Sequence, residues 1–424
     1  MQAPRPMRGM RDILPGEAGV RLHTLGVIRE AYRQHGFFEI ETPVVETLET
    51  LTSSGAGENE KLMFKVLKRG ERLDTAIAGS GEDLADAALR FDLTVPLARF
   101  YSINQSKLPK PFYAMQLGPV FRAERPQRGR FRQFLQTDID VLGDPSFLAE
   151  VQLLIAATSA LHKIGLEGFE IHLNDRRILE FILGKLEIPK DLYSTAMIAL
   201  DKLDKQSVAE VVAELESKGI STEHSTRLVT VLGQLSDAAS LKALADLGVP
   251  KELIANLAAI QQHVTTSVRD VPVIFDPLIV RGIGYYTSTV YEIIHPQWSG
   301  SIGGGGRYDL LLARFGTDTP ACGVSLGFER VVGLVEELGL LRETGSRRLT
   351  VIFEPENQTA EALSKARHFR REGFLVTLLA HQSGARSPMK RLALAAEELK
   401  AEGSVDSFYH FTVGSDEAPR LLMQ

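Results

Sequence analysis

One stretch constrains the fold more than any other: "YAMQLGPVFRAERPQRGRFRQFLQTDIDVLG", residues 113–143. Its two apolar arms have the pattern of strands, and the basic, Gly-containing segment between them predicts a long β-hairpin. Side chains alternate across a strand, so positions 134, 136, 138 and 140 share one face, and we place Arg122 and Glu124 on the partner strand. That face carries Arg, Glu, Gln and Asp. It is therefore either exposed to water or the floor of a polar pocket.

The charge balance indicates what the basic segment is for. Five arginines lie between Arg122 and Arg132, yet the chain has 424 residues and a net charge of -6. An acidic chain does not coat nucleic acid through charge alone. The arginines therefore either form ion pairs in a solvated loop or serve a local site. Arginine suits phosphate oxygens, whereas carboxylates and amides suit a small ligand that bears a cation or an amide.

The remaining pattern predicts several domains. Residues 1–175 combine helices and strands, residues 176–265 carry successive helix signals, and strands return over 266–342. After the linker "RETGSRR", residues 346–424 alternate strand and helix as βαβαβ, which predicts a small α/β domain. A single cysteine excludes an internal disulfide. With no signal-peptide pattern and no apolar run long enough for a membrane helix, we expect a cytoplasmic protein without membrane contact.

Three further segments carry polar or flexible residues next to predicted strands. "LIVRGIGYYTSTVYEI" contains Arg281, and "GGGGRYD" contains four consecutive glycines that permit either close approach to a ligand or a tight turn. "ACGVSLGFERVVGL" leads from a strand into a helix that begins near Arg330. Taken singly, each also fits an ordinary turn or an exposed helix start.

Together and in this order, the segments resemble the class II aminoacyl-tRNA synthetases, most closely the histidyl-tRNA synthetases. "GFFEIETPVVE" resembles motif 1, "GPVFRAERPQRGRFRQFLQTDIDVLG" motif 2 and "GVSLGFERVVGL" motif 3. "VRGIGYYTSTVYE" resembles the peptide peculiar to the histidine enzymes, and "RFDLTVPLARF" and "GGGGRYD" resemble histidine-pocket segments. The resemblance implies an α+β fold, in which an antiparallel catalytic sheet flanked by helices carries the helical insertion and the small C-terminal α/β domain.

The resemblance also implies roles for individual residues. Arg122 and Arg281 would be catalytic at the α-phosphate. The ATP site would comprise Arg122, Glu124, Arg130, Phe134 and Arg330, with Mg²⁺ as the accompanying ion and no assigned metal ligands. The histidine pocket would comprise Asp92, Thr94, Gln136, Asp140, Tyr286 and Tyr308.

The implied activity is that of an enzyme, a histidine–tRNA ligase. It would activate histidine with ATP to histidyl-adenylate, transfer histidine to tRNA(His), and work as a homodimer through motif 1. Two departures bear on this. Gly284 stands where the family usually has Asp or Asn, and the C-terminal domain is shorter than the family's anticodon-binding domain. Two alternatives stay open: a catalytically silent, histidine-sensing regulatory subunit of ATP phosphoribosyltransferase, and a paralog that transfers histidine to an acceptor other than tRNA.

Overall fold

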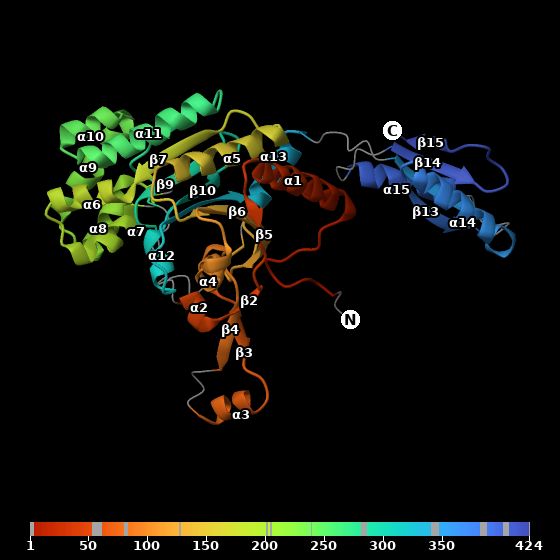
Figure 1. The fold of residues 1–424 in the computed structure, drawn as a ribbon, viewed down its shortest axis with the longest axis horizontal. Helices are drawn as coiled ribbons and strands as arrows, with labels where there is room; N and C mark the ends of the chain where they lie inside the picture. Colours follow the sequence, from red (N-terminus) through yellow and green to blue (C-terminus); the bar gives the residue numbers. More distant parts are fainter. Residues whose placement is uncertain are drawn as a thin grey trace. The chain divides into compact units, whose positions relative to one another are not determined.

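The chain has two parts that we describe separately. The computed structural model describes residues 4–52, 62–79, 84–126, 129–200, 202–203, 206–238, 240–280, 286–340, 347–381, 388–401 and 407–423. Two compact units divide the chain, Met1–Met10 with Val27–Leu334 and Arg11–Gly26 with Val335–Gln424. The first unit is built on a large, mainly antiparallel sheet and the second on a smaller sheet (Figure 1). The α+β class predicted from the sequence is confirmed.

The large sheet contains the predicted hairpin. Its strands in spatial order are β1 (Phe38–Glu39), β5 (Phe112–Phe121), β6 (Gln133–Leu142), β11 (Ala321–Gly327), β10 (Ser301–Arg307), β9 (Thr289–Ile294), β7 (Glu170–Asp175) and β8 (Val273–Phe275). The outermost pairs, β1–β5 and β7–β8, are parallel, and the pairs between them are antiparallel. The four-glycine run therefore lies inside strand β10, and the tight turn considered for it is wrong.

Pro43 separates two short strands that belong to different sheets. Before it, β1 joins the large sheet, and after it β2 (Val45–Thr47) pairs with another sheet in the order β2–β4–β3. Proline has no N–H for a sheet ladder, so the chain changes sheets there. The partners are β3 (Lys65–Leu67) and β4 (Ala85–Leu89). Two short helices in this region were not predicted, α2 (Leu48–Thr52) and α3 (Glu71–Ala78), the latter at the far end of the β3–β4 hairpin (Figure 1).

The first unit also contains helices. They are α4 (Thr94–Asn104) with the 3₁₀ turn Gln105–Lys107, α5 (Leu148–Ile164), α12 (Asp309–Ala313) and those parts of α1 (Pro15–Gln34) and α13 (Phe328–Glu337) that fall within Val27–Leu334. A buried cluster joins α4, the hairpin and α12 through Leu97, Tyr101, Phe112, Leu312 and the adjacent Tyr308. Burial of such side chains contributes roughly 1.5–3 kcal/mol each. The cluster thereby sets the distance between α4, β6 and α12, which carry or adjoin the polar residues described below.

The segment after β7 is helical, as the sequence predicts. Its elements are α6 (Arg176–Lys185), the 3₁₀ turn Lys190–Leu192, α7 (Tyr193–Leu200), α8 (Val208–Ser217), α9 (Thr222–Ala238), α10 (Leu241–Leu247) and α11 (Lys251–Ser267). Local signals set their ends. Ser207 and Glu210 form a reciprocal capping box at the start of α8, which satisfies backbone donors that the helix cannot pair itself.

The C-terminal unit contains the predicted strands and one more. In chain order it comprises β12 (Arg347–Phe353), α14 (Pro355–Arg371), β13 (Phe374–Ala380), α15 (Met389–Ala401), β14 (Ser407–Thr412) and β15 (Arg420–Met423). The sheet order is β13–β12–β14–β15, in which β15 is antiparallel to its neighbour and the other pairs are parallel. Strand β15 was not predicted, because a segment of this length is too short to show an alternating pattern.

Candidate active site

Arg122 lies where the hairpin opens. Strand β5 ends at Phe121, so the prediction that Arg122 belongs to the strand is wrong by one residue, although its N–H still donates to the carbonyl of Arg132 at 2.8 Å. Its Nε donates to the carbonyl of Phe91 (2.9 Å) and its Nη2 to Gln136 Oε1 (3.4 Å). The guanidinium also lies 5.1 Å from the ring centroid of Phe134. Three predicted site residues, Arg122, Phe134 and Gln136, are thus brought together.

Glu124 and Arg130 face each other in the loop of the hairpin. Their side chains form an ion pair at 3.5 Å, with Arg130 about half exposed. Glu124 was also predicted to lie in the strand, which is wrong because pairing ends at Phe121 and Gln133. The loop does keep Glu124 in place, since Arg132 Nε donates to its carbonyl at 3.0 Å. Both predicted residues therefore lie in the loop that follows Arg122 and not on the face of the sheet.

Three buried carboxyl groups, Asp92, Asp138 and Asp140, lie on the polar face of the hairpin and beside it. Asp140 Oδ1 accepts a hydrogen bond from the hydroxyl of Tyr308 at 2.5 Å, while its Oδ2 is buried without a partner among the residues that the structure describes. Gly323 on β11 lies opposite, and a Cβ there would come within 1.9 Å of Asp140 Oδ1. The glycine is therefore required for this carboxyl group to fit between the strands.

Burial governs the protonation of these acids. It raises the pKa of Asp92 to about 6, against the opposing hydrogen bond from the Val95 N–H and the charge of Arg122. Burial raises the pKa of Asp138 to about 7 and, with the nearby charge of Asp138, holds the pKa of Asp140 well above its usual range. Perturbed carboxyl groups in a polar site are typical of positions that receive a cation or a donor from a ligand.

Asp138 belongs to the site although the resemblance did not assign it a role. Gln136 Nε2 donates to its two oxygens at 3.2 and 3.1 Å, and the Ser325 hydroxyl donates to Oδ1. The sequence held a signal for it: Asp138 lies two residues from Gln136 and two from Asp140, on the same strand face. Ser325, in contrast, lies in an apolar strand pattern and gives no such signal.

The other predicted residues are less directly connected. Asp92 and Thr94 lie at the start of α4, where Asp92 Oδ1 accepts from the Val95 N–H at 3.2 Å. Tyr286 packs against the cluster that contains Tyr308. Arg330, in the first turn of α13, donates to the carbonyl of Ser301. Two residues singled out from the sequence, Arg281 and Gly284, lie outside the described residues.

Trp298 joins the hairpin loop to α13. It lies in the connection between β9 and β10, and its ring lies close to two glycines. A Cβ at Gly129 in the loop, or at Gly333 in α13, would lie 2.8 Å from a carbon of this ring. The large side chain therefore fills the space between the loop that carries Arg130 and the helix that carries Arg330.

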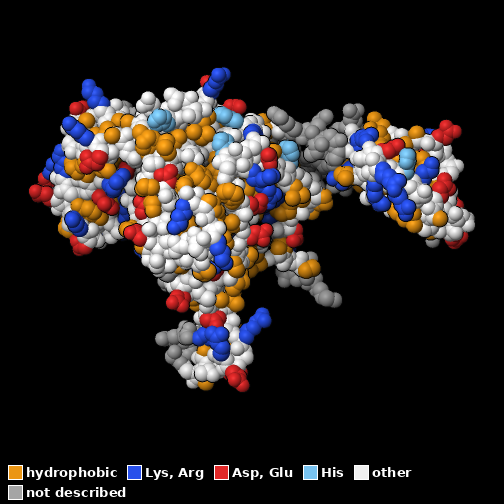
Figure 2. Space-filling model, viewed as in Figure 1, with side chains coloured by type: hydrophobic (Ala, Val, Ile, Leu, Met, Phe, Trp, Pro, Cys, Tyr) orange, Lys and Arg blue, Asp and Glu red, His pale blue; other side chains and the backbone are white. Residues whose placement is uncertain are grey.

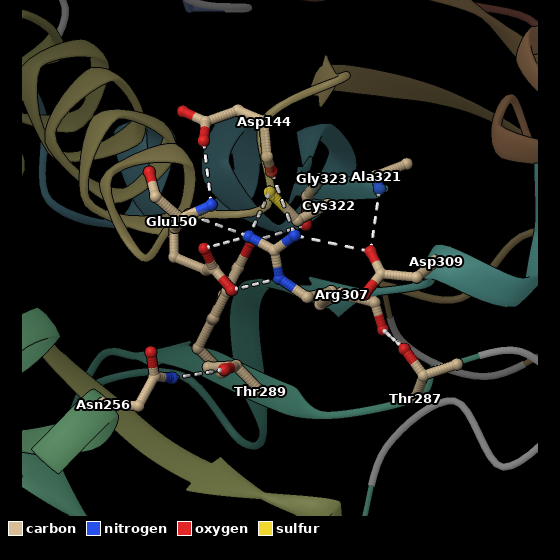
Figure 3. Close-up of polar contacts among 12 residues, drawn as sticks. Asp144, Glu150, Asn256, Thr287, Thr289, Arg307, Asp309, Ala321, Cys322 and Gly323 are labelled. Carbon is tan, nitrogen blue, oxygen red and sulfur yellow. Dashed lines mark hydrogen bonds and ion pairs between the residues drawn. The ribbon is translucent and has the colours of Figure 1, made fainter. Parts of the chain in front are cut away.

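Next to Tyr308, Arg307 forms a buried ion pair of a different kind (Figure 3). Its Nε and Nη2 donate to the two carboxylate oxygens of Glu150 at 2.7 and 2.5 Å, and carbonyls of Asp144 and Ser146 accept further bonds. Asp309 contributes a weaker contact at 3.4 Å. Burial acts to lower the pKa of Arg307, but the bonds to Glu150 outweigh it and the pKa is raised. A cavity of about 410 Å³ lies beside this pair.

Two absences hold for the described part of the chain. Within it, no three His, Cys, Asp or Glu side chains gather closely enough to hold a metal ion. No helix there has the length and apolar character that a membrane span needs.

The arrangement suits a ligand that carries both an acidic and a basic group. Arg122 presents a guanidinium whose N–H groups can bind phosphate or carboxylate oxygens. Farther along the same hairpin, Asp140 offers an unpartnered buried oxygen to a donor or cation. A ligand with a carboxylate at one end and a nitrogenous cation at the other matches this polarity.

Comparisons with known proteins find relatives that cover most of the chain. Residues 9–331 match the family model described as histidyl-tRNA synthetase. A histidine–tRNA ligase from Leifsonia xyli is 44% identical over 82% of this chain and 84% of its own length. A probable histidine–tRNA ligase from Tropheryma whipplei is 38% identical over 93% of each chain. The crystal structure of a histidyl-tRNA synthetase from a Nostoc species superposes with a TM-score of 0.74 at 27% identity, covering 96% of this chain and 91% of that one.

Proposed function

The chain belongs to the histidyl-tRNA synthetase family, and we propose that it is a histidine–tRNA ligase that uses the Arg122 and Asp140 site for amino-acid activation. In the first step a carboxylate oxygen of histidine attacks the α-phosphorus of ATP, and the bond to the leaving pyrophosphate breaks. In the second, a ribose hydroxyl at the 3′ end of tRNA(His) attacks the carbonyl carbon of histidyl-adenylate and AMP leaves.

The observation that carries the proposal is the unpartnered Oδ2 of Asp140, buried beside the Tyr308 hydroxyl. Histidine can supply the missing donor through its imidazole N–H. Gln136 and Tyr286 would complete the surroundings of the ring, and Asp92 with Thr94 would receive the α-ammonium group. A pocket of directed polar groups rejects a ligand that leaves them unpaired, by as much as ~10⁴–10⁵-fold, so the pocket selects histidine without a separate editing site.

The arginines would serve the triphosphate. Activation brings a carboxylate against a phosphate, so positive charge aimed at the reacting atoms lowers the barrier. We assign this role to Arg122 and Arg281, with Glu124 and Phe134 on the adenine and Arg130 and Arg330 on the outer phosphates. Mg²⁺ would arrive with ATP, since this ion is usually held by substrate phosphates and one or two carboxylates rather than by a cage of protein ligands.

The test is exchange of labelled pyrophosphate into ATP that depends on histidine. The wild-type chain should support it, and Arg122→Ala should lower its rate by about 10²–10³-fold, as for loss of one preorganised donor. Arg72→Ala is the matched control, because this exposed arginine forms its ion pair with Asp86 on the β3–β4 hairpin. Histidine binding without any exchange would overturn the proposal and favour the regulatory, histidine-sensing alternative.

We also propose that the chain is a cytoplasmic homodimer. Strand β1 is the edge of the large sheet, and Phe38 on it is 57% exposed; Val45, just beyond Pro43, is 47% exposed. An exposed apolar edge favours pairing with a second copy. Light scattering at micromolar concentration should give the mass of two chains, and a monomer mass would contradict the proposal.

Transfer to tRNA would involve the C-terminal unit. Figure 2 shows Lys and Arg side chains gathered on it, and the last turn of α14 carries His368, Arg370 and Arg371. Contacts from such residues to phosphates would give binding that weakens with salt. Removal of residues 345–424 should therefore leave pyrophosphate exchange largely intact and strongly reduce charging of tRNA(His) at one fixed salt concentration. Equal charging by both forms would contradict a role for this unit, and exchange without charging by the full chain would favour the paralog with another acceptor.

A further inference from the structure

We infer that Asp138 is a positioning residue for amino-acid activation, because it fixes the amide of Gln136 so that the oxygen of this amide, and not its nitrogen, faces Arg122. The inference rests on the proposed function and extends it to a residue that lies behind the site. Asp138 is 4% exposed and contacts the side chains of Gln136 and Ser325, so it acts through Gln136 rather than on the substrate.

The contacts around Gln136 fix the orientation of its side-chain amide. Its Nε2 donates to Asp138 Oδ1 (3.2 Å), Asp138 Oδ2 (3.1 Å) and Ser325 Oγ (3.3 Å). Its Oε1 accepts from Arg122 Nη2 at 3.4 Å. An amide turned by 180° would place an oxygen against both carboxylate oxygens and an NH₂ group against the guanidinium. One contact would then join two acceptors and the other two donors, which is costly for buried groups.

Asp138 itself is held by a row of side chains across the sheet. In register, Gln116 on β5, Asp138 on β6 and Ser325 on β11 are cross-strand neighbours. Gln116 is buried and fixed at both ends of its amide, since it accepts from the Thr42 hydroxyl at 3.0 Å and donates to the carbonyl of Leu93 at 3.0 Å. Because directly opposed side chains on one face lie about 5 Å apart, the row leaves the carboxyl group of Asp138 little freedom.

The orientation of Gln136 in turn affects the position of Arg122. Its guanidinium is oriented by the carbonyl of Phe91 and by Gln136 Oε1. A donor that stabilises a transition state must be held in position before the reaction, by groups that are themselves locked. Loss of the Gln136 oxygen would remove one of these two acceptors from Arg122. A fault at Asp138 should therefore appear as slower activation rather than as a general loss of structure.

An exchange of the two polar groups tests the inference. Asp138→Asn removes one of the two acceptors that face Gln136, and Gln136→Glu places two carboxyl groups against each other. We expect each single variant to lower kcat/KM for histidine-dependent pyrophosphate exchange by about 10- to 100-fold, and the two changes to be non-additive because the groups are in contact. In the double variant Asp138→Asn with Gln136→Glu, the amide introduced on one side donates to the carboxylate introduced on the other, whose second oxygen still faces Arg122. The double variant should therefore be more active than either single variant, with kcat recovering more than KM for histidine.

Thr137→Ser is the matched control, since its hydroxyl points to the other side of the strand and donates to the carbonyl of Leu326. It should stay within about two-fold of wild type. Wild-type-like exchange in Asp138→Asn, or a folded double variant no more active than the single variants, would overturn the inference. If Asp138→Asn does not fold, Ser325→Ala removes one donor to the same carboxyl group, and full activity there would also overturn it. Absence of exchange in the wild-type chain would instead contradict the proposed function.

Discussion

Two groups of buried charges lie on strands of the large sheet, and they are completed in different ways. Arg307 on β10 donates from Nε and Nη2 to both carboxylate oxygens of Glu150, and backbone carbonyls accept further bonds from its Nη1 and Nη2. Asp138 and Asp140 on β6 lie near one further acid, Asp92, and one oxygen of Asp140 has no partner among the described residues. A buried charge is costly unless it is paired. The first group is complete within the protein, whereas the second keeps one buried acceptor, Asp140 Oδ2, to which the described residues supply no donor.

Residue type alone does not distinguish the two groups, whereas the pairing of their charges does. Both groups contain buried carboxyl groups, and both border the "GGGGRYD" segment through the adjacent residues Arg307 and Tyr308. The pair with Glu150 fixes β10 to α5, and the next residue then places its hydroxyl on Asp140. The complete group thus holds the incomplete one in position.

The largest effect should come from breaking the complete group. Glu150→Ala leaves the guanidinium of Arg307 buried without its carboxylate, which typically costs about 3–5 kcal/mol. The free energy of unfolding, measured in denaturant, should fall by that amount. Glu180→Ala removes a half-exposed partner of Arg176 and serves as the control, with a change within about 0.5 kcal/mol. A small loss in Glu150→Ala would mean that the two groups do not differ as described.

A change at Asp140, in the incomplete group, should affect histidine binding rather than stability. Asp140→Asn keeps the size of the side chain and removes a carboxyl group whose ionised form is disfavoured by burial and by Asp138, so the free energy of unfolding should stay the same or rise. Histidine should bind more weakly, with KM for histidine raised by about 10- to 100-fold, as for loss of a charged hydrogen bond of roughly 1.5–3 kcal/mol. KM for ATP should change far less. Equal changes in both KM values would show that Asp140 does not face the amino acid.

The smallest effect should be a dependence of stability on pH. The folded chain holds protons on Asp92 and Asp138, whose pKa values burial raises to about 6 and about 7, while the unfolded chain releases them near pH ~4. Stability from these groups is therefore present at low pH and is lost as pH rises from about 4 to about 7. Asp138→Asn should flatten this slope in ligand-free protein, whereas Asp74→Asn, at an exposed position on α3, should not. An unchanged slope in Asp138→Asn would contradict the assignment.

The sequence predicted the hairpin and most of the polar face because side-chain alternation is a local property. It placed Gln136, Asp138 and Asp140 on one side of β6, and the structure agrees. It did not predict that β5 ends before Arg122, because an arginine fits a strand and a loop equally well and only the partner strand decides the end of pairing. The role of Ser325 and the pair of Glu150 with Arg307 could not be predicted, since these partners lie 187 and 157 positions apart and meet only in the folded chain.

Trp298 has a consequence for how the protein can be observed. It is the only tryptophan in the chain, so the tryptophan emission of the intact protein comes from this one indole ring. The ring lies between Gly129 of the hairpin loop and Gly333 of α13, in contact distance of both backbones. A shift of that loop toward or away from the helix changes the surroundings of this ring. A change in tryptophan emission therefore reports on the surroundings of Trp298 alone. The unmodified chain thus carries its own optical probe at the loop beside Arg130.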